Sequence, residues 1–509
     1  YIFERFNLRE EDIDLCVMTD IQTAERIGRK INAKETIVIH HHLAHIMSGW
    51  ALTAWRDFSA VSIDGGGDYG SWLSFAKVVD RKIIDWEANC GCRLDKNGRY
   101  RDSIIHKKPL RRLAWPGWAF GTYWSFPTVV NFGMLDRNGI GGYEGKLMGL
   151  AAHGNAERFD PKKNNYTGCF ELKKGRNYNY IKTKGHPKIG DKRHCVTKDG
   201  KRVSLLEVKK RRKEKVILYE YNLKEKEDFM LASDFAALLQ NKTNTAITEL
   251  FNNNFAPGEQ MVLTGGTFGN VVTNGLLNRK YKVFVTPPMG DEGLALGAAA
   301  WGAYISGIRE LEYPGIYTGF DAGLNESVDT KEVAELLANK KIVGLIDGRM
   351  EMGPRALGAR TILSDPQDNH VNFTINERLG RVEYMPFAPV ILEEHADDVL
   401  VGWSREQISS KHMTLLYQVK DKWRERLKGV VHVDGSVRPQ VISKEDNPFY
   451  YSIVESYYKK TGIPVLINTS FNAHGEPMLR TVEEGISALK DNRIDVLIAG
   501  DKIRYAKER

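Results

Sequence analysis

Short apolar strands that alternate with helical segments constrain the fold of this chain more than any other feature. Within residues 1–115, short runs rich in β-branched and apolar side chains occur at 15–18, 36–39, 60–63 and 73–78. Segments with helical spacing separate these runs. This alternation is typical of an α/β protein, so we expect strands and helices to be layered against each other.

Side chains with metal-binding chemistry follow two of these strands. His41 and His45 stand four residues apart, so both imidazoles project from one face of a helix. The strand 60–63 leads Asp64 into the turn Gly65-Gly66-Gly67, where backbone N–H groups can approach a ligand closely. Two imidazoles and a carboxylate match the preference of a divalent transition metal. A hydrogen-bonded helix start and a plain Asp-Gly turn are the alternative interpretations.

Two later strands also end in glycine-containing turns. The strand 260–263 runs into Gly265-Gly266, and glycines there admit a base or ribose against the backbone. The strand 282–286 leads into Gly290-Asp291. Candidate ligands therefore recur at the carboxyl ends of strands, which is where α/β sheets place their sites.

Two charged motifs are candidates for catalysis and for phosphate binding. Lys146 could contact a phosphate, while Glu144 could hold a metal-bound water or a substrate hydroxyl; a surface ion pair is the alternative. Arg349, Arg355 and Arg360 surround a Gly-Pro turn. Guanidinium groups match phosphate oxygens in bidentate geometry, so this arginine cluster predicts an anion site.

Composition indicates a soluble globular protein of two or three domains. The chain has 509 residues, of which 42% are hydrophobic and 27% charged. No apolar run approaches the length of a membrane span, and the N-terminus has no signal-peptide pattern, so we expect no membrane association. Five cysteines without a C-x-x-C motif favour a reducing cytoplasm. Cys90-Gly91-Cys92 could bind a metal, although we favour a surface turn.

The net charge of +8 comes partly from the basic run 209–213. Such a run is usually a solvated loop face, and this is the interpretation we favour. It could also meet an anionic substrate or nucleic acid.

Taken in order along the chain, the motifs resemble those of the O-carbamoyltransferase family of nodulation-factor, aminoglycoside and ansamycin biosynthesis. The motifs that carry the resemblance are His41-His42-Leu43-Ala44-His45, Asp64-Gly65, Glu144-Gly145-Lys146-Leu147-Met148-Gly149-Leu150-Ala151, Gly265-Gly266, Gly290-Asp291-Glu292-Gly293, Gly353-Pro354-Arg355-Ala356-Leu357-Gly358, Pro386-Phe387-Ala388-Pro389, Asp434-Gly435 and Asn468-Thr469-Ser470-Phe471-Asn472.

The resemblance implies an α/β chain with an actin/Hsp70-like (ASKHA) ATPase domain, similar to the tRNA threonylcarbamoyl-transfer ATPase, followed by a YrdC-like α/β domain. We expect the first domain at 1–312, with an insertion at 155–228, a linker at 313–330, and the second domain at 331–509. The family's opening strand and phosphate loop have no counterpart in this sequence. We therefore expect either a preceding segment or impaired phosphate binding.

The resemblance also implies an ATP-dependent O-carbamoyltransferase. In such enzymes the YrdC-like domain makes carbamoyl-adenylate from carbamoyl phosphate and ATP, and the ATPase-like domain transfers the carbamoyl group to an acceptor hydroxyl. We expect Fe²⁺ or another divalent transition metal in the transfer domain, and Mg²⁺ could accompany ATP. The resemblance allows a homodimer.

Several alternatives concern the acceptor and the activity. A hydroxyl-bearing small molecule is the default acceptor, and a hydroxymethylated pyrimidine nucleotide or DNA is the alternative. Carbamoylation of a protein or tRNA, as in hydrogenase maturation, is a further possibility, but the sequence lacks the zinc-finger and acylphosphatase-like segments of the hydrogenase type. A nucleotide-binding regulatory protein without catalysis is the alternative from another class.

The resemblance assigns site residues by position. The implied metal ligands are His41, His45, Asp64 and Asp291. The implied catalytic residues are His41, His45, Glu144, Lys146 and Arg355. The implied binding residues for ATP and carbamoyl phosphate are Gly65, Gly66, Lys146, Gly265, Gly266, Asn270, Gly290, Asp291, Arg349, Arg355, Arg360, Arg381, Arg438, Asn468 and Ser470. Many members carry a Lys and a second Arg where this chain has Leu379 and Met385, with Arg378 and Arg381 as substitutes.

Overall fold

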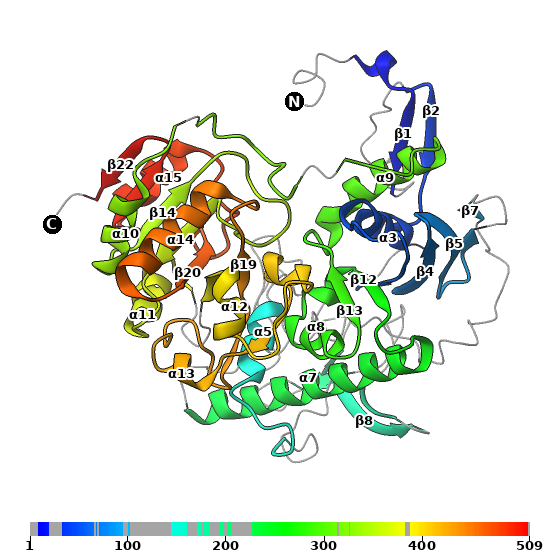
Figure 1. Ribbon diagram of the computed structural model, residues 1–509. Coiled ribbons are helices and arrows are strands. Elements are labelled where there is room, and N and C mark those ends of the chain that lie inside the picture. Colours follow the sequence, from blue (N-terminus) through cyan, green and yellow to red (C-terminus); the bar gives the residue numbers. More distant parts are fainter. Residues whose placement is uncertain are drawn as a thin grey trace. The chain divides into compact units, whose positions relative to one another are not determined.

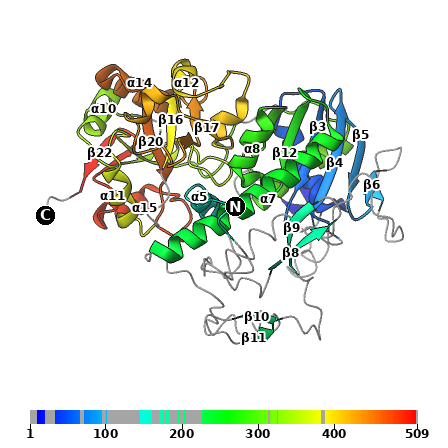
Figure 2. The ribbon, with the colours of Figure 1, turned by 90° about the horizontal axis from the view of Figure 1, so that it is seen from below.

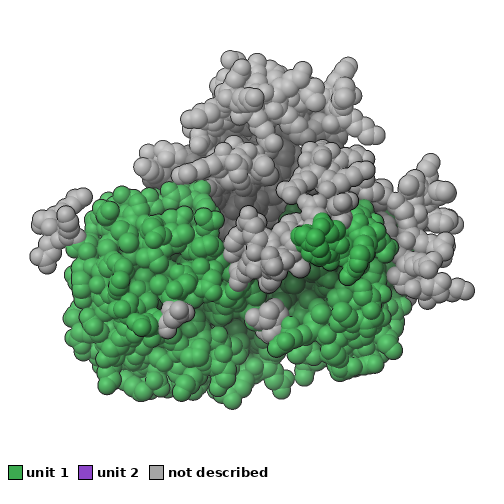
Figure 3. Space-filling model, turned by 90° about the horizontal axis from the view of Figure 1, so that it is seen from above, with its two compact units in different colours: residues 1–121, 254–431, 435–509 green, residues 122–253, 432–434 purple. Residues whose placement is uncertain are grey.

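A computed structural model describes most of the chain (Figure 1). The chain forms two compact units, of which Figure 3 shows unit 1 in green. Unit 1 comprises residues 1–121, 254–431 and 435–509, and unit 2 comprises residues 122–253 and 432–434. The residues that the structure describes are 9–19, 33–65, 68, 71–94, 100–101, 144–159, 170–175, 178–183, 194–196, 202–204, 226–312, 315–324, 326–381 and 387–506. The division into domains at 1–312 and 331–509 stays a prediction.

The first sheet of unit 1 has seven strands in the order β13-β12-β3-β4-β5-β6-β7. Its strands are β3 (Phe58–Ile63), β4 (Leu73–Val79), β5 (Lys82–Ala88), β6 (Arg93–Leu94), β7 (Tyr100–Arg101), β12 (Gln260–Thr264) and β13 (Lys282–Val285). The pairs β3–β12 and β12–β13 are parallel, whereas β3, β4 and β5 pair antiparallel. All six residues of β3 are buried, as expected for an internal strand of apolar and small side chains.

One helix packs on this sheet, and a second helix packs closely against the first (Figure 1). They are α3 (His41–Leu52) and α9 (Leu294–Ile305), and buried side chains of both, such as Trp50 and Trp301, belong to one apolar core with Phe58. A Cβ on Gly297 of α9 would lie 1.8 Å from the carbonyl oxygen of Ala44 in α3. The helix backbones therefore approach so closely that only glycine fits at 297.

The segments around this sheet include a separate parallel pair and three short turns of 3-10 helix. The pair is β1 (Leu15–Met18) with β2 (Glu35–Val38), and the short helices are η1 (Glu10–Asp12), η5 (Gly266–Gly269) and η6 (Asp291–Gly293). Helix α8 (Val271–Asn278) follows η5. The strands predicted at 36–39 and 282–286 therefore exist and end one residue earlier than predicted.

The second sheet of unit 1 also has seven strands, in the order β19-β16-β20-β15-β14-β21-β22. Its strands are β14 (Val343–Ile346), β15 (Arg360–Ser364), β16 (Ala388–Leu392), β19 (Gln440–Ile442), β20 (Val465–Ser470), β21 (Val496–Ala499) and β22 (Lys502–Tyr505). Parallel and antiparallel pairs are mixed, since β14 pairs antiparallel with β15 and parallel with β21. The helices around it are α10 (Thr330–Ala338), α11 (His370–Arg378), α12 (Glu393–Val399), α13 (Asp421–Arg424), α14 (Pro448–Thr461) and α15 (Val482–Lys490).

Short elements complete the second region. They are η7 (Ile408–His412) and the two-stranded pair β17 (Tyr417–Gln418) with β18 (Ser436–Val437). Helices α10 and α14 pack against each other, and α14 also contacts β16 and β20 of the sheet (Figure 2). Layers of helix and mixed sheet in both regions confirm the predicted α/β class.

The described residues of unit 2 form two helices and two hairpins. Its helices are α5 (Glu144–Ala151) and most of α7 (Lys226–Asn254), and its antiparallel pairs are β8 (Phe170–Gly175) with β9 (Tyr178–Thr183) and β10 (His194–Val196) with β11 (Arg202–Ser204) (Figure 2). The predicted insertion at 155–228 therefore contains hairpins in its described part. Arg158 and Asp234 form an ion pair at 2.7 Å that fixes the chain after α5 onto α7.

Among the helices that the structure describes, none is long and apolar enough to cross a bilayer.

We expect Gly297→Ala to lower the free energy of unfolding. Alanine gains up to about 1 kcal/mol of helix propensity over glycine, but its Cβ would clash with the Ala44 carbonyl, and such overpacking costs about 1–3 kcal/mol or more. Chemical denaturation measures the difference. The control, Ala299→Ser at an exposed position of the same helix, should change stability by less than about 0.5 kcal/mol. A G297A variant as stable as the parent would contradict the close approach of α3 and α9.

Candidate metal centre and anion-binding residues

Helix α3 presents His41 and His45 on one face, as predicted. The helix begins at His41, and the side chain of His40 caps it, because His40 Nδ1 accepts a hydrogen bond from the His42 N–H at 3.1 Å. The Nε2 atoms of His41 and His45 lie 3.2 Å apart. The four-residue spacing thus brings two imidazole nitrogens to one point.

Asp64 meets both imidazoles from the end of β3. Its Oδ2 lies 3.2 Å from His41 Nε2 and 3.0 Å from His45 Nε2. Its Oδ1 accepts a hydrogen bond from the Gly65 N–H at 2.6 Å. One carboxylate oxygen is therefore held by its own turn, while the other faces the histidine pair.

Asp291 completes the group from the turn after β13. Its Oδ1 lies 3.5 Å from Nε2 of both His41 and His45. The four donor atoms of His41, His45, Asp64 and Asp291 all lie within 4.8 Å of one another. The structure therefore brings together the residues that the resemblance implied as metal ligands.

The double glycine after β12 makes this convergence sterically feasible. Gly265 has a φ of +92°, and a Cβ there would lie 2.3 Å from the Ile63 carbonyl oxygen. The Gly265 N–H donates to the Met289 carbonyl at 2.7 Å, which ties this turn to the segment that leads to Asp291. A Cβ on Gly266 would lie 3.0 Å from Asp64 Oδ1. The turns after β3, β12 and β13 therefore lie against one another.

The electrostatics of the group favour a bound cation. Burial alone would raise the pKa of Asp64, but hydrogen bonds from His41 and His45 outweigh it and hold that pKa far below its usual value. Burial disfavours a charged His45, yet its hydrogen bonds to Asp291 and Asp64 raise its pKa. Asp64 is thus an anion at neutral pH, beside two nitrogen donors. Such a group of N and O ligands suits a divalent transition metal.

Asp68 is a residue of this centre that the sequence analysis missed. Its Oδ2 accepts a hydrogen bond from the backbone N–H of His41 at 2.7 Å, at the first residue of α3. A carboxylate at a helix N-terminus is favourable both as a hydrogen-bond acceptor and through the helix dipole. Its place in the same glycine-rich turn as Asp64 was the available signal.

His42 has a structural role beside the centre. Its Nδ1 lies 2.8 Å from Ser62 Oγ of β3. Burial, followed by the charges of the neighbouring histidines, lowers the pKa of His42 well below its usual value. The middle histidine of the motif is therefore a neutral core residue that fixes α3 to the sheet.

Arg355 and Arg438 have the features of an anion site. Arg355 Nε is buried and has no hydrogen-bond partner among the described residues. Burial lowers the pKa of Arg355, and the carboxylate of Glu292 opposes this effect. Burial and then the charge of Arg355 lower the pKa of Arg438. Two cations that disfavour each other's charge are stabilised by an anion between them.

Glu351, which the sequence analysis did not assign, shapes the turn that carries Arg355. Its Oε1 accepts hydrogen bonds from the N–H groups of Leu357, Ala359 and Arg360, at 2.6, 3.1 and 3.3 Å. The only signal in the sequence was a lone acidic residue inside an arginine-rich segment.

Other implied anion ligands already have protein partners in this structure. Arg360 is fully buried, and its guanidinium donates to backbone carbonyls that include those of Asp347, Gly348 and Arg480. Asn468 donates to the Ala356 carbonyl at 3.0 Å and to Gln440 at 2.7 Å. These two residues hold the loops around Arg355, and their contact with a substrate stays a prediction.

Arg381 and Ser470 lie together at the end of β20. Arg381 Nη2 donates to Ser470 Oγ at 3.1 Å and to Asn472 Oδ1 at 2.9 Å, and burial lowers the pKa of Arg381 to about 10. Arg349 donates to the Thr318 carbonyl at 3.0 Å. The structure thus places Arg381 with Ser470, apart from the partners of Arg349.

The remaining residues that the resemblance implied lie in different elements of the structure. Asn270 caps α8, since its Oδ1 accepts from the Thr273 N–H at 3.1 Å. The Gly290 N–H donates to Glu292 at 3.1 Å. Glu144 and Lys146 belong to α5 of unit 2, but their side chains lie outside the described residues, as does Gly66.

Two family models match the chain and together cover most of its length. The model described as "Carbamoyltransferase N-terminus" matches residues 6–300, and "Carbamoyltransferase C-terminus" matches residues 334–505. The first match includes every residue of the metal-ligand group, and the second includes the arginine cluster.

The chain is also similar to individual proteins. MJ1051 of Methanocaldococcus jannaschii is 28% identical over 508 residues, which cover 94% of this chain and 85% of that protein. The nodulation protein NolNO of Sinorhizobium fredii is 26% identical, covering 94% of this chain and 65% of that protein. A structure of full-length HypF is 23% identical over 33% of this chain and 20% of that chain, with a TM-score of 0.26, which supports no statement about fold. The two family matches show that the chain belongs to the carbamoyltransferase family and is a carbamoyl-transferring enzyme.

Proposed function

We propose that this enzyme is an ATP-dependent O-carbamoyltransferase that makes carbamoyl-adenylate from carbamoyl phosphate and ATP and transfers the carbamoyl group to a hydroxyl of a small molecule. The convergence of His41, His45, Asp64 and Asp291 at adjoining strand ends carries this proposal. The family matches support a role of this group in carbamoyl transfer, since they include both the residues of this centre and the arginine cluster.

The metal centre would hold Fe²⁺ or another divalent transition metal through His41, His45, Asp64 and Asp291. Its fit rests on donor types and spacing, because two nitrogens and two carboxylate oxygens face one point at pair distances of 3.0–3.5 Å. When bound, such an ion polarises a carbonyl oxygen. The chain's own contribution is to fix both imidazoles through Asp64 and the packed helix α3.

Arg355 and Arg438 are proposed to bind the phosphate of carbamoyl phosphate. A buried guanidinium Nε without a partner in the described part of the chain is costly, and a phosphate oxygen would satisfy it. Cations placed there also stabilise negative charge that develops on a leaving phosphate. Arg349 and Arg381, with Ser470, are proposed as further contacts of the adenylate-forming site, and Arg360 and Asn468 as residues that hold its loops.

The nucleotide is proposed to lie against the glycine turns of the first sheet. Gly265 and Gly266 bring this turn close to Ile63 and Asp64, and backbone N–H groups of a glycine turn can approach a ligand closely. Asn270, Gly65, Gly66 and Gly290 are proposed to line the same region. Lys146 is proposed to contact phosphate, and Glu144 or one of the histidines to accept the proton of the acceptor hydroxyl.

The acceptor has one specific alternative. The basic run 209–213 and the net charge of +8 would suit a hydroxymethylated pyrimidine nucleotide or DNA. Binding of DNA should then fall steeply as salt rises, whereas carbamoylation of a neutral small alcohol should not.

The central prediction concerns the intermediate. Incubation with ATP and carbamoyl phosphate should release phosphate and pyrophosphate and yield carbamoyl-adenylate, detected by mass spectrometry. Adding a panel of small alcohols, hydroxymethylated nucleotides and DNA should place a carbamoyl group on one class of acceptor. If no carbamoyl-adenylate forms under these conditions, the proposal is wrong.

A second prediction concerns the metal ligands. We expect Asp64→Asn and His45→Ala to weaken Fe²⁺ binding by more than roughly 100-fold. Loss of a residue that only hydrogen-bonds to a ligand costs roughly 10–100-fold, whereas these changes remove donor atoms themselves. The measurement is metal content after anaerobic loading and desalting. His395→Asn, at a histidine whose ring packs against Tyr458 in the second region, is the matched control and should leave Fe²⁺ content unchanged. Normal Fe²⁺ binding by D64N would remove Asp64 from the centre.

A third prediction concerns Arg355. Arg355→Gln should lower kcat/KM for carbamoyl phosphate by about 10²–10³-fold, because a charge-assisted contact to developing negative charge is lost. Arg355→Lys should recover only part of this loss, since lysine lacks the planar fork. Arg405→Gln, at an exposed arginine, is the control. Unchanged kinetics in R355Q with intact Fe²⁺ binding would contradict the anion site.

A further inference from the structure

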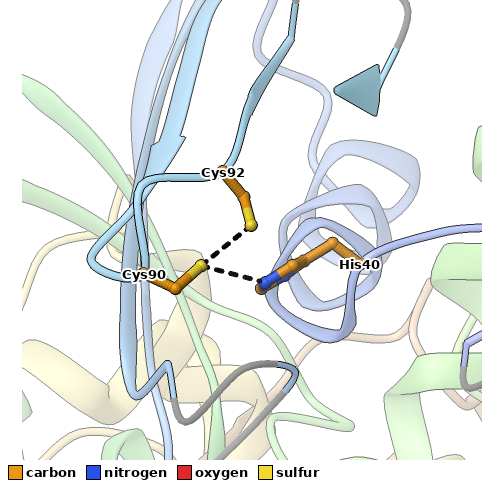
Figure 4. Close-up of side chains that lie close together, drawn as sticks. All are labelled: His40, Cys90 and Cys92. Atoms are coloured by element: carbon orange, nitrogen blue, oxygen red, sulfur yellow. Dashed lines mark hydrogen bonds between the residues drawn. The ribbon is translucent and has the colours of Figure 1, made fainter. Parts of the chain in front are cut away.

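A second cluster of potential metal ligands lies beside the start of α3. It consists of His40, Cys90 and Cys92, and one donor atom of each lies within 4.8 Å of the others (Figure 4). Cys90 Sγ lies 3.0 Å from Cys92 Sγ and 3.6 Å from His40 Nε2. These residues are separate from the centre formed by His41, His45, Asp64 and Asp291.

The turn between β5 and β6 brings the two sulfurs together. Gly91 has a φ of +93°, and its N–H donates to the Ala88 carbonyl at 2.8 Å. The Ala88 N–H donates to the Cys92 carbonyl at 3.0 Å. The left-handed glycine thus closes a tight turn, and Figure 4 shows both thiols facing the imidazole of His40.

The change of backbone at the helix start separates His40 from His41. His40 is extended, with φ −61° and ψ 137°, whereas His41 is the first helical residue. Their Nε2 atoms therefore approach different partners: His41 approaches Asp64 at 3.2 Å, and His40 approaches Cys90. Adjacent histidines in the sequence consequently belong to different clusters.

The surroundings of the cluster suit sulfur ligation. His40 and Cys92 are buried, Cys90 is partly buried, and Trp86 packs edge-on against His40 at 5.3 Å between ring centroids. A hydrogen bond with Cys92, and then burial, raises the pKa of Cys90. Cys90 without a metal is therefore a thiol, and a bound metal ion would deprotonate it.

We propose that His40, Cys90 and Cys92 form a second metal site, which takes a thiophilic ion such as Zn²⁺. Two thiolates and an imidazole are the ligands that zinc prefers, and the described residues supply all three. Binding releases two protons, one from each thiol, and forms two Zn–S bonds. The ion would fasten the β5–β6 turn to the start of α3, the helix that carries His41 and His45.

Ligand spacing is close to that of a zinc site. With Zn–S and Zn–N distances of about 2.3 and 2.1 Å, tetrahedral geometry requires sulfur–sulfur and sulfur–nitrogen separations of about 3.8 and 3.6 Å. The Cys90–His40 separation of 3.6 Å already agrees. The sulfurs, at 3.0 Å, must move apart on binding, which a side-chain rotation of the partly buried Cys90 allows.

His40 contributes less to the affinity for the metal ion than the two cysteines do. Its Nδ1 accepts the His42 N–H, so the proton of the neutral ring is on Nε2 in the metal-free chain. Ligation through Nε2 moves that proton to Nδ1 and gives up the capping hydrogen bond. The two thiolates therefore provide most of the affinity.

Cobalt spectroscopy tests the site without reference to enzyme activity. The full chain is loaded with Co²⁺, because thiolate-to-cobalt charge transfer gives a near-ultraviolet band that histidine and carboxylate ligands cannot give. We expect this band in the parent chain and in Asp64→Asn, and its loss in Cys90→Ser and in Cys92→Ser. Cys16→Ser, at a partly buried thiol of β1 outside the cluster, is the matched control and should keep it. The proposed function, in contrast, predicts that D64N loses Fe²⁺. An experiment can therefore contradict one proposal and leave the other intact.

Zinc affinity then tests His40. Asparagine is a good helix cap but not a zinc ligand, so His40→Asn keeps the hydrogen bond to the His42 N–H and removes the imidazole. Competition against a chromophoric chelator should show zinc binding weakened by about tenfold in H40N and by a larger factor in C90S. Absence of the charge-transfer band in the parent chain, or a Cys90–Cys92 disulfide in chain prepared under reducing conditions, would overturn the site. Parent-like zinc affinity in H40N would overturn the assignment of His40.

Discussion

The parallel pairing of β3, β12 and β13 is the constraint on which the metal centre depends. Ser62 pairs with Thr264, and Leu263 pairs with Val285, so the carboxyl ends of all three strands lie at one edge of the sheet. Asp64, the double glycine and the segment to Asp291 follow those ends directly. Helix α3 then needs only to cross this edge for its histidine pair to meet both carboxylates. Gly265 and Gly297 permit the close backbone approaches that this arrangement requires.

Charge is divided between two regions with opposite chemistry. The centre of His41, His45, Asp64 and Asp291 combines carboxylates with imidazoles, which suits a cation. In the second region, the charge of Arg355 acts on Arg438 and lowers its pKa, and such a pair of cations suits an anion. The arginines of this segment nevertheless have different roles. Arg360 donates hydrogen bonds to backbone carbonyls, whereas Arg355 Nε has no partner in the described part of the chain. The surroundings of each arginine, rather than its residue type, therefore decide whether it holds a loop or is available to an anion.

The start of α3 links two clusters of potential ligands. His40 lies before the first helical residue and faces Cys90, while His41 and His45 face Asp64. His42 contacts Ser62 of β3 and anchors the helix between them. Four histidines within six residues therefore have three different environments, because an extended residue, a helix and a buried strand meet there.

The sequence by itself determined the α/β class, the shared face of His41 and His45, and the positions of Asp64 and Asp291 after strands. These features depend on local periodicity and turn chemistry, which a single segment records. Only the tertiary structure decided that β12 pairs with β3, that Asp68 and Glu351 hold their turns, that Arg360 is occupied by carbonyls and that His40 meets Cys90 and Cys92. Each of these features depends on contacts between residues that the local sequence pattern does not bring together. Burial at these contacts then decides which polar groups have hydrogen-bond partners.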